Sequence, residues 1–248
     1  MSKKKYLFFA VIIFSSLCLF ATPEHGVLCL TFDDYYGKNW LKADAIFKKY
    51  DAHATFFIVG EITPEKIEVM KKLQAAGHSV GLHTAHHRNA TNFMKSKGEK
   101  WYLDNEILPQ LKICRENGLN IRNFAYPNNR RDEKTDAMLY KYFDYLRAGN
   151  GPAKKQLYYS ARSIKKQMVL GGGGIGVFYK SDVEELKSRI DHAAKNNQLI
   201  VFFSHNIAPE IGGVHMPTAT LEALLAHAQK LGMKVVGFDQ LESLNSGK

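Results

Sequence analysis

Short apolar runs alternate along this chain with longer amphipathic segments. Apolar runs bounded by turn residues are typical of buried strands, and longer segments with helical periodicity are typical of surface helices. The pattern predicts strands at Val27–Phe32, Ala54–Val59, Ser79–Leu82, Asn123–Tyr126, Tyr145–Arg147, Leu199–Ser204 and Lys234–Phe238. It predicts helices between them at Trp40–Tyr50, Pro64–Ala76, Lys95–Asn117, Ser181–Asn196 and Thr218–Leu231.

Several helix boundaries carry local signals. Pro64 suits the first turn of its helix, and Gly77 would end that helix. Pro109 is expected to kink or break the long third helix, because proline lacks the N–H that the helical ladder uses. Ser181, followed three residues later by Glu184, predicts a capping box.

Strand–helix–strand repetition predicts parallel strands joined by crossover helices. About seven such units favour an α/β fold, a distorted or incomplete (β/α) barrel of about seven parallel strands, over an open sheet. In parallel barrels, the chemistry gathers at the carboxyl ends of the strands. The residues that fall at such ends are Asp33, Asp34, His83, Pro127 and His205.

The N-terminal segment is predicted to lie outside the fold. Three lysines precede an apolar stretch, Tyr6–Phe20, that is short for a membrane span, and Ala21 then offers a cleavage point. This arrangement is typical of a secretory signal peptide at 1–21, with an uncleaved anchor as the alternative, and leaves one domain at 22–248. The protein is therefore expected to be exported and to be periplasmic, held at the cell envelope, or secreted.

The chain is basic, with a net charge of +10, or +7 without the three lysines of the N-terminal segment, which holds no acid. Moderate basicity aids solubility, and attraction to anionic envelope polymers is the alternative. No basic stretch is interleaved with aromatic residues, so nothing indicates nucleic-acid binding, and no stable protein partner is implied. Cys29 and Cys114 are predicted to be buried core residues rather than a disulfide.

Two glycine-containing stretches interrupt the pattern. Gly149–Lys155 is predicted to be a turn-rich loop. The run Gly171–Gly174 lacks the Lys-Ser/Thr that follows in a phosphate loop, so it is predicted to be a flexible or closely packed turn near the site rim.

Carboxylates and imidazoles gather at the predicted strand ends. Burying such groups is costly unless they are paired or bound to a metal. His83 and His87, at i and i+4, can reach one cation if the segment turns back on itself. One carboxylate from Asp33 or Asp34 would complete a two-His, one-carboxylate set with open positions for water and substrate. His86 lies between the two histidines and could replace His87.

The two adjacent aspartates are expected to have different roles, because neighbouring side chains of an extended segment point in opposite directions. One can face a cation while the other stays ionised beside the reacting water as a general base. His205 follows a very apolar strand, and its position at the strand end makes it a candidate general acid. Zinc is the first expectation for the divalent cation, and cobalt, nickel and manganese suit the same set.

From Val27 to Leu244, the chain resembles the polysaccharide deacetylases, the NodB-homology group also classed as carbohydrate esterase family four. Thr31-Phe32-Asp33-Asp34 is similar to the family's T-F-D-D motif, which implies Asp33 as general base and Asp34 as metal ligand. The resemblance also implies a distorted (β/α) barrel, often of seven strands. It makes 22–248 a catalytic domain of this family.

Two later motifs contain the histidines. His83-Thr84-Ala85-His86-His87 is similar to the family's H-S/T-x-x-H, which implies His83 and His87 as metal ligands and His86 as a bystander. Phe203-Ser204-His205 is similar to the late strand motif that carries the catalytic acid. The family's fourth motif, with an Asp and a Trp near this histidine, is not recognisable.

The third motif departs from the family pattern R-x-P-Y-G, because Ala125 stands where the arginine would. Asn128 and Asn129 replace the usual Tyr-Gly, and the backbone N–H of Asn128 could still polarise the acyl oxygen. Arg147, near the end of the next predicted strand, is expected to supply the missing charge to Asp33. The predicted substrate and oxyanion residues of this motif are Tyr126, Pro127 and Asn128.

The resemblance implies metal-dependent removal of N-acetyl groups from an envelope or extracellular polysaccharide, with release of acetate. The bond cleaved would be an amide but not a peptide bond, and no organic cofactor is implied. The alternatives are O-acetyl removal from a glycan, a non-catalytic glycan-binding relative that keeps the metal site, and a small-substrate amidase.

Overall fold

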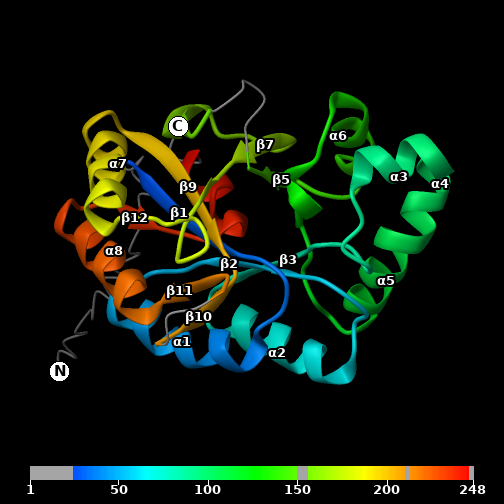
Figure 1. The fold of residues 1–248 in the computed structure, drawn as a ribbon, viewed down its shortest axis with the longest axis horizontal. Coiled ribbons are helices and arrows are strands. Elements are labelled where there is room, and N and C mark those ends of the chain that lie inside the picture. Colours follow the sequence, from blue (N-terminus) through cyan, green and yellow to red (C-terminus); the bar gives the residue numbers. More distant parts are fainter. Residues whose placement is uncertain (1–24, 150–155, 210–212, 246–248) are drawn as a thin grey trace, which may run out of the picture.

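Figure 1 shows a computed structural model of the protein, which describes residues 25–149, 156–209 and 213–245. The predicted signal peptide at 1–21 lies outside the described residues, as does most of the loop predicted at Gly149–Lys155. The strands are β1 (Val27–Phe32), β2 (Thr55–Ile58), β3 (Ser79–Leu82), β4 (Asn123–Ala125), β5 (Tyr145–Ala148), β6 (Tyr158–Ser160), β7 (Met168–Gly171), β8 (Gly173–Gly174), β9 (Gln198–Ser204), β10 (Asn206–Ala208), β11 (His215–Pro217) and β12 (Lys234–Val235).

Eight α-helices are found in these ranges, with a π-helical turn at Leu103–Ile107 and short 3-10 turns at Pro127–Asn129, Ala161–Ser163, Phe238–Gln240 and Glu242–Asn245. The α-helices are α1 (Gly37–Lys49), α2 (Pro64–Ala75), α3 (Ala90–Lys97), α4 (Glu99–Tyr102), α5 (Leu108–Glu116), α6 (Glu133–Leu139), α7 (Val183–Lys195) and α8 (Thr218–Lys230). None of them is long and apolar enough to cross a membrane.

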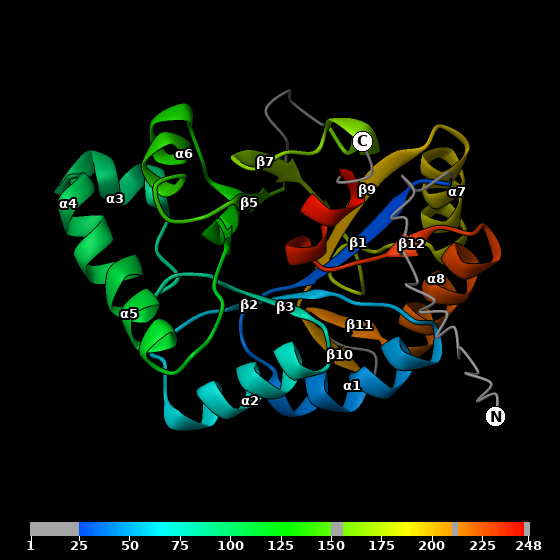
Figure 2. The same ribbon diagram turned by 180° about the vertical axis from the view of Figure 1, so that it is seen from behind.

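The main sheet has the strand order β6-β9-β1-β2-β3-β4-β5-β7, with β12 paired to β1 and β8 to β9. Its pairs are parallel except β6 with β9. The sheet curls, with α1 and α2 along one side, α7 and α8 beside β9 and β12, and α3 to α5 at the other end (Figures 1 and 2). The predicted α/β fold with an incomplete parallel barrel is confirmed.

Alternation along each strand separates the side chains into two apolar clusters. Leu28, Leu30 and Phe32 of β1 belong to the larger cluster, which includes the helix residues. Val27 and Cys29 belong to a smaller cluster on the inner face of the curl. Since successive side chains of a strand point to opposite faces, Thr31 and Asp33 lie on the same inner face as Val27 and Cys29.

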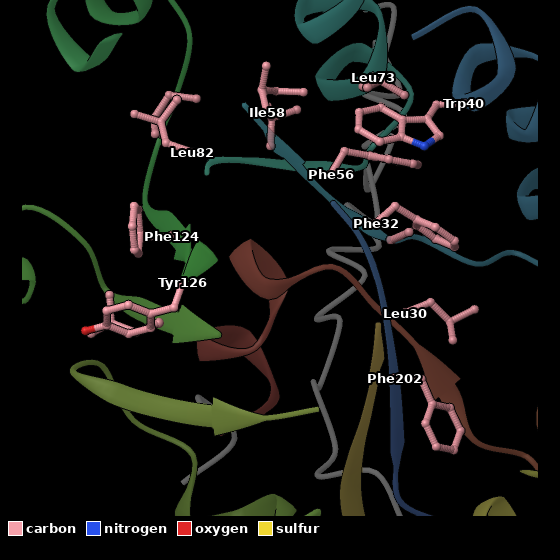
Figure 3. Close-up of a cluster of buried hydrophobic side chains, with 14 of the residues drawn as sticks. Leu30, Phe32, Trp40, Phe56, Ile58, Leu73, Leu82, Phe124, Tyr126 and Phe202 are labelled. Atoms are coloured by element: carbon pink, nitrogen blue, oxygen red, sulfur yellow. The ribbon is translucent and has the colours of Figure 1, made fainter. Parts of the chain in front are cut away.

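Aromatic rings fill the layer between sheet and helices (Figure 3). The ring of Phe32 stacks on that of Phe56 at 5.4 Å, and Trp40 of α1 lies 5.0 Å from Phe56. All three side chains are fully buried. Fully burying one large apolar side chain contributes about 1.5–3 kcal/mol, so this layer holds β1 and β2 firmly against α1.

The helical stretch predicted at Lys95–Asn117 is divided directly before Pro109, as expected, and also at Gly98, which was not expected. It is interrupted at Gly98, which has a φ of +91°, a conformation that favours glycine. Its hydrogen-bond ladder then widens to the π-helical turn Leu103–Ile107, directly before α5. Pro109 lies in the first turn of α5, where a missing N–H is tolerated.

The capping box predicted at Ser181 and Glu184 is also wrong. The N-cap of α7 is Asp182, whose carboxylate accepts a hydrogen bond from the backbone N–H of Glu185 (2.9 Å). Ser181 instead accepts one from the N–H of Gly176 (3.3 Å). Aspartate is as good an N-cap as serine, so the helix begins one residue later than predicted.

The glycine run predicted as a turn forms strand instead. Gly171 ends β7, and β8 pairs with β9 in parallel. Close packing there is confirmed, because a Cβ on Gly174 would lie 2.5 Å from the ring of Tyr179. The short strands β6, β7, β10 and β11 were not predicted, and the last predicted strand ends at Val235 rather than Phe238. Cys29 and Cys114 are buried free thiols, as expected.

His78 provides a test of the pH dependence of the fold. Its Nδ1 accepts a hydrogen bond from the N–H of Ala54 (3.0 Å), and its Nε2 lies 3.2 Å from a carboxylate oxygen of Asp44. Burial lowers the pKa of His78 to about 4. The unfolded chain therefore binds more protons below an ordinary histidine pKa, and the fold loses stability as the pH falls.

Between pH 7 and pH 5, His78 should cost about 2 kcal/mol of unfolding free energy, measured by urea titration at each pH. His78→Asn keeps an acceptor for Ala54 but does not titrate, so it should lose less stability than the wild type over the same interval. Equal losses in both proteins would show that His78 is not the responsible group.

Candidate metal centre and active site

The register of the parallel strands brings the predicted site residues to one edge of the sheet. Phe32 of β1 pairs with Ser204 of β9, so Asp33 and His205 leave their strands at the same level. The N–H of Asp33 donates to the carbonyl of Ser204 (2.9 Å), and that of His83 donates to the carbonyl of Ile58 (2.9 Å). The carboxyl ends of β1, β3 and β9 thus meet at the mouth of the curl.

Three of the predicted residues converge with the geometry of a cation site. One ligand atom from each of Asp34, His83 and His87 lies within 4.8 Å of the other two. The Asp34 carboxylate is 3.8 Å from Nε2 of His83 and 3.7 Å from Nε2 of His87. Metal–ligand bonds of about 2 Å would span such separations, so the donor set fits a divalent cation.

His83 is held in the tautomer that a ligand needs. Its Nδ1–H donates to the carbonyl of Ala125 (2.8 Å), which leaves Nε2 facing Asp34. Burial lowers the pKa of His83 to about 4, so the imidazole is neutral at physiological pH. A backbone acceptor behind a ligating histidine fixes its ring orientation and raises its basicity.

His86 lies apart from this set. Its Nδ1 is 2.9 Å from a carboxylate oxygen of Glu106, and its side chain is 55% exposed. Within the described residues, the grouping that could hold a metal consists of Asp34, His83 and His87. The geometry therefore favours His87 over His86 as the second histidine.

Asp33 is buried on the inner face and forms an ion pair with Arg147. Burial alone would raise the pKa of Asp33, but Arg147, His83 and His205 together lower it below its usual value. The second arm of the guanidinium donates to the side-chain oxygen of Asn129 (2.5 Å). Asp33 is consequently held as a carboxylate.

Arg147 reaches Asp33 from the strand next to the one that carries the third motif. Ala125 of β4 is the register partner of Arg147 of β5, and neither side chain faces the helix layer. The guanidinium carbon lies 4.6 Å from the ring centre of Phe203, which covers it on the inner face. Arg147 on β5 therefore provides the positive charge that Ala125 lacks, from the neighbouring strand and the same register position.

His205 lies beside the cation set, with Nε2 4.0 Å from the Asp34 carboxylate. Its ring stacks with that of Tyr179 at 6.4 Å and 12°. Trp40 donates its indole N–H to the carbonyl of His205 (2.9 Å). Nδ1 of His205 has no hydrogen-bond partner among the described residues, and Asn206 instead accepts a bond from Asn39.

The third-motif residues lie differently from the expectation. Tyr126 points into the helix-side core, where its hydroxyl donates to Asp136 (2.7 Å), so the prediction that it lines the site is wrong for its side chain (Figure 3). Strand alternation places Tyr126 on the outer face, one position after Ala125. Pro127 is buried, and Asn128 is exposed with a φ of +54°.

The two ligand loops contain backbone strain. Asp34, Thr84 and His87 have φ values of +73°, +70° and +55°, and a β-branched residue such as threonine is rarely found there. Hydrogen bonds oppose relaxation: the carbonyl of Asp34 accepts from Val59, and that of Thr84 from Gly60, both at 3.0 Å. Strain of this kind persists where the surroundings over-determine it, often at functional sites.

Sequence reasoning missed Asn129, Tyr179 and Glu106 as parts of this region. Asn129 belongs to the altered third motif, but its bond to Arg147 was not predicted, and the contact of Tyr179 with His205 joins segments that no motif connects. Glu106 had a weak signal, because it lies three residues after Leu103 on the buried side of its helix. A charged residue on such a side indicates a buried partner.

Comparisons with known proteins show the family and the fold of the chain. A polysaccharide deacetylase family model matches residues 21–163. Over 93 residues, the chain is 34% identical to a peptidoglycan-N-acetylglucosamine deacetylase of Bacillus cereus, which covers 38% of this chain and 31% of that protein. The peptidoglycan deacetylase PdaC of Bacillus subtilis superposes with a TM-score of 0.57 at 18% identity, over 90% of this chain and 92% of that one.

A carbohydrate esterase family four pseudoenzyme from Bacillus anthracis also shares the fold, with a TM-score of 0.55 at 20% identity, over 88% of this chain and 66% of that one. The family model covers more than half of the chain, which therefore belongs to the polysaccharide deacetylase family. The chain spans about a third of the curated Bacillus cereus relative that it matches.

The ligand assignment can be tested by metal titration. His83→Ala and His87→Ala each remove a donor, so zinc affinity measured by calorimetry should fall by two or more orders of magnitude, roughly the value of one lost coordinate bond. His86→Ala removes no donor and should weaken binding only a few-fold. If His86→Ala abolishes binding while His87→Ala retains it, the assignment is reversed.

Proposed function

We propose that this protein is a metal-dependent hydrolase that removes N-acetyl groups from an envelope or extracellular polysaccharide and releases acetate. The observation that carries the proposal is the ionised Asp33, paired with Arg147, next to the Asp34, His83 and His87 set. In this proposal, Asp33 is the base beside the cation site, at the mouth of the parallel half-barrel. Family membership supports the same reaction class.

Asp34, His83 and His87 are the residues that would hold a divalent cation, zinc first among zinc, cobalt, nickel and manganese. When bound, such a cation supplies Lewis-acid polarisation of the acyl oxygen and acidifies a water. Asp33 takes the proton of the attacking water, because its low pKa keeps it ionised and ready to accept. Arg147 is a positioning residue that holds Asp33 in place.

The remaining steps concern the acyl oxygen and the leaving group. The backbone N–H of Asn128 donates to the developing negative charge on that oxygen, a role that does not depend on its side chain. His205 protonates the departing amine, and the Tyr179 ring stacked on it keeps its orientation. The products are acetate and a free amino sugar.

The altered third motif favours a second candidate, a non-catalytic glycan-binding relative. Ala125 replaces the arginine, and a pseudoenzyme is among the structures that share the fold. The Arg147–Asp33 pair argues against this candidate, because the charge is restored at Asp33. An O-acetyl esterase would use the same residues and differs in the bond cleaved.

The proposal includes export, with a signal peptide at 1–21 and a catalytic domain at 22–248. Both fit an enzyme whose substrate is an acetylated polymer outside the cytoplasm. The same substrate is the expected partner of the protein. Neither nucleic acid nor a stable protein partner is part of this function.

Acetate release from N-acetylated and O-acetylated glycans, with zinc-loaded protein, tests the reaction. Asp33→Asn removes the base and should lower kcat by roughly 10²–10⁴-fold while zinc remains bound. Acetate with a matching free amine identifies amide cleavage, and acetate alone identifies an ester. No acetate from any glycan, with zinc bound, would support the binding role instead.

The role of Arg147 is tested by Arg147→Ala and Arg147→Lys. The alanine variant leaves Asp33 buried without a partner, so the pKa of Asp33 should rise and the acid limb of the kcat/KM profile should move to higher pH. The lysine variant keeps the charge and should recover part of the activity. Full activity of Arg147→Ala with an unshifted profile would exclude the positioning role.

A further inference from the structure

Glu106 is a fully buried carboxylate that the proposed reaction does not use. It lies in the π-helical turn Leu103–Ile107, and its side chain has no exposed surface. Burying a carboxylate is costly unless it is paired and hydrogen-bonded. The partners of Glu106 therefore indicate what it does.

All described hydrogen bonds of the Glu106 side chain go to the segment that carries the ligand histidines. One carboxylate oxygen accepts from the backbone N–H of His86 (2.9 Å). The other lies 2.9 Å from Nδ1 of His86 and accepts from Nη1 of Arg88 (3.0 Å). The main-chain carbonyl of Glu106 accepts from the N–H of Ala85 (3.1 Å). Glu106 thus bonds to three positions of the loop, Ala85, His86 and Arg88, and makes two of its bonds to His86.

Arg88 is itself held in place on the far side of Glu106. Its guanidinium carbon lies 5.2 Å from the ring centre of Phe93 and 5.4 Å from that of Trp101, and these rings stack on each other at 5.8 Å. The hydroxyl of Tyr102 donates to the carbonyl of Arg88 (3.1 Å). The segment that ends in Glu106 therefore fixes the loop from residue 85 to residue 88.

The contacts of Glu106 lie where the loop is strained. Thr84, directly before the bonded residues, and His87, between His86 and Arg88, have positive φ values. Without external bonds, a chain relaxes from such conformations, which disfavour residues that carry a Cβ. Two oxygens of one rigidly held carboxylate, and one carbonyl, oppose that relaxation.

We infer that Glu106 is a positioning residue that sets the metal affinity of the site, because it engages His86 and fixes the loop so that His87 faces Asp34. This inference rests on the cation site of the proposed function but not on deacetylation. It also explains the choice between adjacent histidines: the carboxylate of Glu106 engages His86 and leaves His87 free. The π-helical turn fits this role, since such turns occur frequently at functional sites.

The test is zinc titration of purified protein by calorimetry, together with hydrogen–deuterium exchange of the metal-free protein. Glu106→Ala removes both acceptor oxygens, and zinc affinity should fall roughly 10- to 100-fold, as for other outer partners of metal ligands. The amide of His86 should exchange faster in the same variant. Glu106→Gln keeps one acceptor oxygen but loses the charge, so its affinity should be intermediate.

Asp136→Asn is the matched control. Asp136 is also a buried carboxylate that pairs with an arginine and accepts a tyrosine hydroxyl, but none of its described side-chain bonds reaches the ligand loop. It should lower the stability of the fold and leave zinc affinity and His86 exchange unchanged.

The outcomes separate this inference from the proposed function. Wild-type affinity and exchange in folded Glu106→Ala would overturn the role of Glu106 and leave the cation site intact. An equal loss of affinity in Asp136→Asn would overturn it as well, because general destabilisation would then be the cause. No zinc binding by the wild type would overturn the cation site and, with it, the role of Glu106.

Discussion

The ion pair between Arg147 and Asp33 is the interaction on which the candidate site depends. A carboxylate must stay ionised to accept a proton, and burial opposes ionisation. Arg147 reverses that balance, and it does so from the strand next to the altered third motif. The same guanidinium binds Asn129 and packs on Phe203. One side chain thus connects the ends of β1, β4, β5 and β9.

The parts of this architecture that depend on local pattern could be predicted from the sequence. Apolar runs predicted most strands of the parallel sheet. The polar residues at the carboxyl ends of these runs included Asp33, His83 and His205, which were therefore predicted as site residues. This prediction did not require the strand order, because the carboxyl ends of all parallel strands lie at the same edge of the sheet. Arg147 could be proposed only because Ala125 left a charge missing. The side chain of Tyr126 was assigned to the wrong face of the sheet, because adjacent residues of a strand point to opposite faces and an error of one residue reverses the assignment.

The remaining parts depend on contacts between distant segments. Glu106 is twenty residues from His86 in sequence, and its turn is neither a regular helix nor a loop. Gly98 breaks a helix that periodicity alone would continue. The strands β6, β7 and β8 are short and gain their pairing from strands distant in sequence, β6 and β8 from β9 and β7 from β5. In each case, tertiary packing overrides a local preference, as it commonly does.

The inner face of the curl changes character along the strand axis. At the amino ends it is filled by Val27, Cys29 and Val201, and at the carboxyl ends it carries Asp33 and Arg147. The apolar base leaves the carboxyl ends of the strands as the side from which Asp33 and Arg147 are approached. Under the proposed function, water, cation and glycan would all reach the site from that side, so a polymer seated there would also cover the cation site.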